Sequence, residues 1–188
     1  MLAALALALV VLSAFAFHRS FPPNDTPDGA YARIAKAIEE EHPRDVFAYL
    51  EQDAVDAVFS IRDMRTRARD AIEKNYPASA ERDALLAEYE PDARTKDAPD
   101  ELLVLDERHG FLARLRKDLS GVAKVETQGD RATVTTARGT RYSFRKRPNG
   151  IWGLTLFTAD LLADSERASR DLASIEAAAS DYARAKKN

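Results

Sequence analysis

The chain of 188 residues contains no cysteine. This absence excludes disulfide bonds, thiolate metal sites, a cysteine nucleophile and a lipid-modified cysteine behind a signal sequence. The sequence also lacks a glycine-rich phosphate loop, a Gly-x-Ser-x-Gly nucleophile motif and a His-Glu-x-x-His zinc motif. With none of these reactive arrangements present, the sequence favours a non-catalytic protein, and we predict no cofactor.

Histidine is scarce as well, and His18, His42 and His109 lie far apart in the chain. The run Glu-Glu-Glu-His over residues 39–42 offers metal-ligand chemistry. Consecutive residues of a helix point in different directions, however, so at most two of these four could share one ion. We therefore interpret the run as a solvated helix end and predict no metal site.

Neither sign of charge dominates the chain. The formal net charge is -3 although 31% of the residues are charged. No global positive field draws such a protein onto nucleic acid, so we expect no nucleic-acid partner.

An apolar run occupies residues 1–17 and is interrupted only by Ser13. As one helix it would span about 25 Å, slightly less than a bilayer core of roughly 30 Å. Ala14-Phe15-Ala16 suits signal peptidase, although no basic residues precede the run. We predict an exported, periplasmic or cell-envelope protein, either cleaved after Ala16 or anchored by residues 1–17.

The rest of the chain is expected to form one α+β domain with a helical tail. Residues 18–29 are rich in turn-forming residues and predict a linker. An α+β domain is expected over residues 30–157 and a long amphipathic helix over residues 158–188. Residues 91–99 are expected to form a loop. Apolar residues at helical spacing predict helices over residues 27–41, 46–50, 53–75, 80–90 and 101–119, the last broken at His109-Gly110.

Three glycines divide the only stretch that is typical of β-sheet. Gly129, Gly139 and Gly150 each stand third in a short break, which is the pattern of a three-residue hairpin loop closed at positive φ. Three such loops predict a four-stranded antiparallel meander over residues 122–157, packed on the helical N-terminal half. Counting back from the loops predicts pairs of Val122 with Val134, Val134 with Tyr142, Ala132 with Phe144, Phe144 with Leu154, Tyr142 with Leu156 and Lys146 with Trp152.

This register separates an apolar face, which should pack on the helices, from a face that carries Arg131, Arg141, Arg145 and Phe157. Arg131 is predicted to lie opposite Arg145, which is destabilising unless an anion lies between them. No carboxylate occurs between Arg131 and Arg147. Two interpretations stay open. The face is either solvated, with its arginines lying along the sheet or meeting acids from a helix, or a docking site for phosphate, acidic polysaccharide or a lipid headgroup.

The apolar face also offers candidate walls for a pocket beneath the sheet. These are Tyr31, Met64, Tyr142, Phe144, Trp152 and Leu154. Trp152 either stacks a ligand, with Lys146 over its ring, or belongs to the core. A catalytic pocket would in addition need a buried acid, histidine or tyrosine with a shifted pKa.

Two stretches resemble exported bacterial members of the nuclear-transport-factor-2-like superfamily of cone-shaped α+β domains. One is Gly-Ala-Tyr-Ala-Arg-Ile-Ala-Lys-Ala-Ile at residues 29–38, followed by Asp-Val-Phe-Ala-Tyr-Leu at residues 45–50. The other runs from Ala-Thr-Val-Thr-Thr at residues 132–136 to Gly-Ile-Trp-Gly-Leu at residues 150–154. The resemblance implies a concave sheet that closes over the helices and often leaves a pocket, and sometimes a sheet-mediated dimer. Its catalytic members need an Asp, Tyr or His at particular pocket positions, and this sequence matches none of them.

We therefore predict an exported or membrane-tethered, non-catalytic domain that binds or scaffolds a membrane or anionic envelope component through its arginine face. The alternative is a small-molecule-binding or enzymatic domain with a pocket under the sheet. The C-terminal helix either packs on its own domain or forms a homodimer. Its seam comprises Leu161, Ala168, Leu172, Ile175, Ala179 and Tyr182.

Overall fold

The computed structural model describes residues 22–186, so the apolar run and its predicted cleavage site lie outside the described residues. The fold is α+β, as predicted, with helices before a four-stranded antiparallel sheet and a long helix after it. The helices are α2 (Pro27–Glu39), the 3-10 helix η1 (Pro43–Tyr49), α3 (Gln52–Asn75), α4 (Ala80–Ala93), α5 (Ala98–His109), α6 (Phe111–Asp118) and α7 (Thr158–Ala185). The strands are β1 (Val122–Gln128), β2 (Arg131–Thr136), β3 (Arg141–Lys146) and β4 (Trp152–Leu154).

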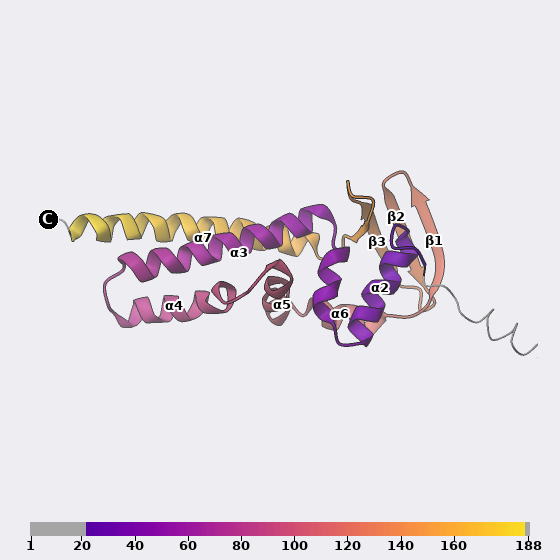
Figure 1. Ribbon diagram of the computed structural model, residues 1–188, viewed down its shortest axis with the longest axis horizontal. Helices are drawn as coiled ribbons and strands as arrows, with labels where there is room; N and C mark the ends of the chain where they lie inside the picture. Colours follow the sequence, from indigo (N-terminus) through magenta and orange to yellow (C-terminus); the bar gives the residue numbers. More distant parts are fainter. Residues whose placement is uncertain (1–21, 187–188) are drawn as a thin grey trace, which may run out of the picture.

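The molecule is elongated (Figure 1). The sheet, α2, η1 and α6 lie at one end, and α3, α4 and α7 run side by side as a helical arm. Buried apolar side chains form two clusters, a larger one beneath the sheet and a smaller one inside the arm. Helix α3 contributes to both clusters, so it joins the two parts of the molecule.

The helix ends follow local capping chemistry. At the starts of α2, α4 and α5, the side chains of Thr26, Ser79 and Asp97 accept hydrogen bonds from backbone N–H groups. Gly110 has φ 66° and separates α5 from α6, which confirms the predicted break.

The loop predicted over residues 91–99 is shorter than expected. Helix α4 continues through Pro91 to Ala93, and its last turn closes where the Arg94 N–H donates to the Glu90 carbonyl at 3.1 Å. Buried Asp92 also binds Arg108 of α5, which holds this turn against the rest of the molecule. A tertiary ion pair therefore extends the helix past a residue that ordinarily ends one.

Two of the three hairpins have the predicted loops and register. The confirmed pairs are Ala132 with Phe144, Val134 with Tyr142, Phe144 with Leu154 and Lys146 with Trp152. Arg131 lies directly opposite Arg145, also as predicted.

The first hairpin is different, and the pairing of Val122 with Val134 is wrong. Gly129 and Asp130 form a two-residue turn, and Val125 lies opposite Val134. Gly129 has φ 62°, which suits the first position of a type II′ turn. Glycine suits both the first position of a type II′ turn and the last position of a three-residue loop. The position of Gly129 in the sequence therefore does not show which of the two turns forms.

This change moves the register of β1 by three residues, an odd number, and so reverses the faces of most of the strand. Lys124, Glu126 and Gln128 consequently share the face of the arginines. A bulge between Val122 and Lys124 returns Val122, opposite Thr136, to the apolar side.

Strand β4 ends earlier than predicted, at Leu154. Leu156 is 46% exposed, and Phe157 is 1% exposed with its ring 4.7 Å from that of Phe111. The predicted pairing of Tyr142 with Leu156 and the placement of Phe157 on the arginine face are therefore wrong. The chain turns here, because the Thr158 N–H donates to the Thr155 carbonyl and α7 begins.

The seam of α7 packs along α3 within the same chain. Leu161, Ala168, Leu172, Ile175 and Ala179 are buried there. Within residues 22–186, no helix is both long enough and apolar enough to cross a membrane.

Candidate functional site

The face of the sheet turned away from the core is hollowed. The hollow has a volume of about 580 Å³. Alternation along the strands brings the arginines and several hydroxyl groups to this one face. We call it the arginine groove, and its lining includes Arg131, Thr133, Arg141, Ser143, Arg145 and Thr155.

Arg145 is held by acids at the start of α3. Its Nη1 lies 3.6 Å from a Glu51 carboxylate oxygen and 3.4 Å from one of Asp53. Glu51 reaches the groove because Gly153, which is opposite Arg145, has no side chain. A Cβ at Gly153 would stand 2.3 Å from the Cα of Glu51, so only glycine allows this close approach of backbone.

Arg131 and Arg141 are placed differently. Among the described residues, neither side chain has an ion pair or a hydrogen bond. Glu126 lies on the same face, but its carboxylate binds Lys124 at 2.8 Å. That hydrogen bond, more than the charge of Arg141, lowers the pKa of Glu126. The guanidinium groups of Arg131 and Arg141 therefore keep their donors free for a ligand.

Five of the six predicted pocket-wall residues come together in the core beneath the sheet. Tyr31, Tyr142, Phe144, Trp152 and Leu154 all belong to the larger cluster, whereas Met64 lies beside the arm cluster. Trp152 donates its indole N–H to the Asp25 carbonyl at 3.0 Å. The Lys146 ammonium lies 5.9 Å from the Trp152 ring centroid, so the expected contact between these two side chains is present.

The two tyrosines of this group differ in their hydrogen bonds. The Tyr31 hydroxyl donates to the Ser120 carbonyl at 2.7 Å and accepts the Ser120 N–H at 3.1 Å. The Tyr142 hydroxyl is buried without a hydrogen-bond partner in the described part of the chain. Burial, together with the neighbouring Tyr31, raises the pKa of Tyr142 to about 12. Tyr142 is therefore neutral at ordinary pH.

A second polar cluster, which the sequence did not predict, lies between α3, α4, α5 and α7. Asp92 and Glu101 are both 0% exposed. Arg108 donates to Asp92 at 2.5 Å, and the Thr95 hydroxyl lies 3.2 Å from Glu101. Burial first, and then the hydrogen bond and charge of Asp92, raise the pKa of Glu101 to about 8. Glu101 thus holds a proton at neutral pH.

That proton explains two polar atoms that otherwise lack partners. Asp92 Oδ1 and Glu101 Oε1 are buried and accept no hydrogen bond from described residues. A protonated Glu101 that donates to Asp92 satisfies both carboxyl groups.

The hollow beside these acids has a volume of about 410 Å³ and is lined by matched charges. His109 binds Asp164, and Arg167 lies 3.2 Å from the same carboxylate. Arg65 lies 3.8 Å from Asp171. Because its cations are already neutralised, this cluster fits a structural connection between helices better than a ligand site. No group of three potential metal ligands occurs in the part of the chain that the structure describes.

The chain was compared with protein families, with curated proteins and with solved structures. No match was found in any of the three. The resemblance to nuclear-transport-factor-2-like domains stays a prediction, and function has to be inferred from the geometry of the arginine groove.

The polar cluster left one signal in the sequence. Glu101 precedes Leu105 by four residues and Arg108 by seven, so all three lie on one face of a helix. An acid and a base in line with a core leucine indicate polar groups that are buried with it, although the acid that Arg108 binds is Asp92. Asp92 gave no such signal, because it fell in the stretch expected to be a loop.

The tyrosines give a matched pair of stability predictions. Tyr142→Phe removes an unpaired buried hydroxyl and is expected to leave the free energy of unfolding unchanged or raise it by up to about 1 kcal/mol. Tyr31→Phe deprives two backbone groups of Ser120 of their partner and is expected to cost roughly 1–2 kcal/mol. Urea unfolding of both variants measures the difference, and a larger loss for Tyr142→Phe would contradict it.

Proposed function

We propose that this chain is an exported or membrane-tethered, non-catalytic domain that binds an anionic envelope component in the arginine groove. One observation carries the proposal. Arg131 lies directly opposite Arg145 at the groove, and Arg131 has no acid partner among the described residues.

The cost of that arrangement supports a ligand. Like charges directly opposite one another in a sheet are destabilising. Glu51 and Asp53 offset the charge of Arg145 but leave that of Arg131. A carboxylate or phosphate group between the two arginines would relieve the repulsion and accept their paired N–H donors.

The neighbouring groups suit the same ligand chemistry. The hydroxyls of Thr133 and Ser143 lie between the Arg131–Arg145 pair and Arg141 along the strands. They can donate hydrogen bonds to a phosphate or carboxylate, or to the hydroxyl-rich groups that accompany such anions. Export is supported by the apolar run at residues 1–17 and by the signal-peptidase pattern that ends at Ala16.

The test is a double charge reversal, Arg131→Glu with Arg141→Glu, in the full chain. We expect it to weaken retention on heparin, and on phosphatidylglycerol vesicles, by at least about tenfold at low salt. Neither arginine makes an ion pair among the described residues, so the fold should survive. Loss on vesicles alone would indicate a lipid headgroup, and loss on heparin a soluble polyanion.

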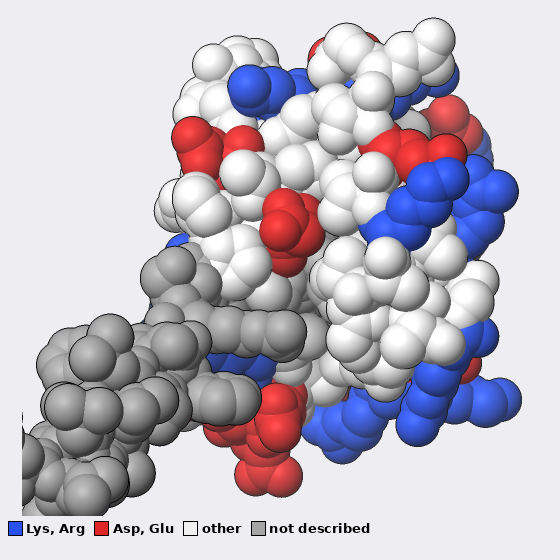
Figure 2. Space-filling model, turned by 90° about the vertical axis from the view of Figure 1, so that its right-hand side faces the viewer, with Lys and Arg blue, Asp and Glu red and all other residues white. Residues whose placement is uncertain are grey.

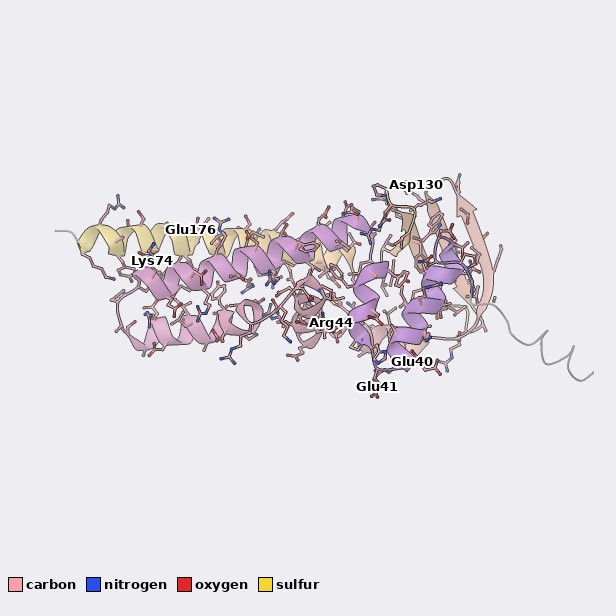
Figure 3. The ribbon with its side chains drawn as sticks, in the orientation of Figure 1. Glu40, Glu41, Arg44, Lys74, Asp130 and Glu176 are labelled. Carbon is pink, nitrogen blue, oxygen red and sulfur yellow. The ribbon has the colours of Figure 1, made fainter. Side chains whose placement is uncertain are left out.

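Lys74→Glu is the control for charge reversal on a remote surface, with half the change in net charge, because Lys74 is exposed near the far end of the arm (Figure 3). It removes the same kind of charge from a surface remote from the groove. Equal retention of the double variant, Lys74→Glu and the unmodified chain would refute the proposed function.

A further inference from the structure

One edge strand of the sheet is covered by another segment of the chain, and the other edge strand is exposed. The strand order is β1-β2-β3-β4, so β1 and β4 are the edges. The link between η1 and α3 covers β4, where Leu50 bridges to Leu154 and the Glu51 N–H donates to the Leu154 carbonyl at 3.2 Å. Strand β1 pairs only with β2 among the described residues, and all seven of its residues are exposed.

Hydrogen bonds at the two ends of β2 fix which backbone groups face which neighbour. The Thr136 N–H donates to the Thr140 carbonyl at 2.9 Å. The Asp130 carbonyl accepts the Lys146 N–H at 2.7 Å. In an antiparallel sheet the backbone N–H and C=O of successive residues point alternately to the two neighbouring strands. The backbone groups of the even-numbered residues of β2 therefore point toward β3, and those of the odd-numbered residues point toward β1.

The outward groups of β1 follow from this alternation. The odd-numbered residues of β2 lie opposite Lys124, Glu126 and Gln128, which therefore use their N–H and C=O groups inside the sheet. The N–H and C=O of Val125 and Thr127 point away from it. A second strand could accept hydrogen bonds from these N–H groups and donate hydrogen bonds to these C=O groups.

The sequence of β1 is complementary to itself. We propose that β1 pairs antiparallel with β1 of a second copy of this chain, about a two-fold axis at Val125. In that register Val125 faces the partner's Val125, and Lys124 faces the partner's Glu126. An axis at Lys124 or at Glu126 instead sets like charges opposite one another, whereas the axis at Val125 sets each lysine opposite a glutamate.

The side chains on both faces fit this pairing. Lys124 and Glu126 already bind each other at 2.8 Å, and two copies would form a ring of four alternating charges. On the other face Val125 is 36% exposed and Val122 is 40% exposed. Figure 2, which views this end of the molecule, shows uncharged atoms over much of its centre. A lone edge lysine prevents pairing, whereas a lysine and a glutamate flanking a valine complement a second copy.

The pairing differs from a dimer through the α7 seam, which is buried within its own chain. It would join two sheets into one of eight strands, with both arginine grooves on the same face. The inference does not depend on the proposed function, because it rests on the β1 edge alone.

A single cysteine tests the axis, since the natural chain has none. Opposite residues of a hydrogen-bonded antiparallel pair have Cα atoms about 5.5 Å apart, within disulfide range. Mild oxidation of the full chain carrying Val125→Cys should give a covalent dimer on a non-reducing gel. Thr127→Cys is the control on the same strand and face. In the proposed register the side chains at position 127 of the two copies would be separated by roughly 13 Å along the strands, so this variant should give no covalent dimer.

Charge reversal tests the register by sedimentation of the full chain in mild detergent. Lys124→Glu and Glu126→Lys should each weaken association at least about tenfold, since each sets like charges face to face. The variant with both substitutions should recover it, and an equimolar mixture of the two single variants should form a mixed dimer. A thermal melt of each variant confirms folding.

Three outcomes would overturn the pairing. They are a chain that stays monomeric up to the highest soluble concentration, equal cross-linking at positions 125 and 127, and an association indifferent to both charge reversals. Dimerisation that survives while heparin binding fails would refute the proposed function and support the pairing.

Discussion

Replacing Glu101 by glutamine is expected to remove much of the pH dependence of stability between about pH 4.5 and pH 8. The folded chain holds the Glu101 proton up to about pH 8, whereas the unfolded chain releases it near the ordinary value of 4.5. In this window the folded state binds more protons. The free energy of unfolding therefore falls as pH rises, by up to about 1.4 kcal/mol per pH unit.

Glutamine keeps a neutral side chain beside Asp92 at every pH, so this contribution to the slope disappears. The variant should equal the unmodified chain near pH 4.5 and exceed it by a few kcal/mol at pH 8. Urea unfolding at several pH values measures the difference. Glu107→Gln, on the exposed side of α5, should retain the original slope. Parallel pH profiles for Glu101→Gln and the unmodified chain would show that Glu101 is ionised in the folded state.

Gly153→Ala is expected to be the most damaging small substitution in the sheet. The added Cβ would lie 2.3 Å from Glu51 Cα and 2.5 Å from the Leu50 carbonyl oxygen. Both are backbone atoms, so relief requires moving the start of α3 away from β4. We expect a loss of at least about 3 kcal/mol in the free energy of unfolding.

The movement should also separate Glu51 from Arg145 and change the arginine groove. Gly121→Ala is the control, because a Cβ there meets nothing within 4 Å and should cost less than about 1 kcal/mol. Denaturant midpoints of the two variants compare these costs. Equal midpoints would mean that β4 and the start of α3 separate easily.

Hairpin chemistry made most of the sheet predictable from the sequence. A glycine third in a break led to the correct loops at Gly139 and Gly150 and to the pairing of Arg131 with Arg145. The same rule failed at Gly129, where a two-residue turn satisfies the same residue. That failure concealed the presence of Glu126 on the arginine face, because an odd shift reverses a strand.

Contacts between distant segments were not predictable. The acids that hold Arg145 come from Glu51 and Asp53, about ninety positions earlier in the chain. Local sequence patterns carry no information about which distant segments come into contact. Even Gly153, which permits the close approach of the Glu51 backbone, resembles any glycine in a strand. The contacts of Asp92 with Arg108 and Glu101 were not predictable for the same reason, since helical acids are usually solvated.

Helix α3 connects the groove to the remote tip of the arm. Its first turn holds Arg145 through Asp53, and at its other end the Asn75 carbonyl accepts Lys186 from the end of α7. A helix of 24 residues is about 36 Å long. The groove and the tip of the arm are therefore joined by one continuous helix, which contacts a groove arginine at its first turn and the end of α7 at its last.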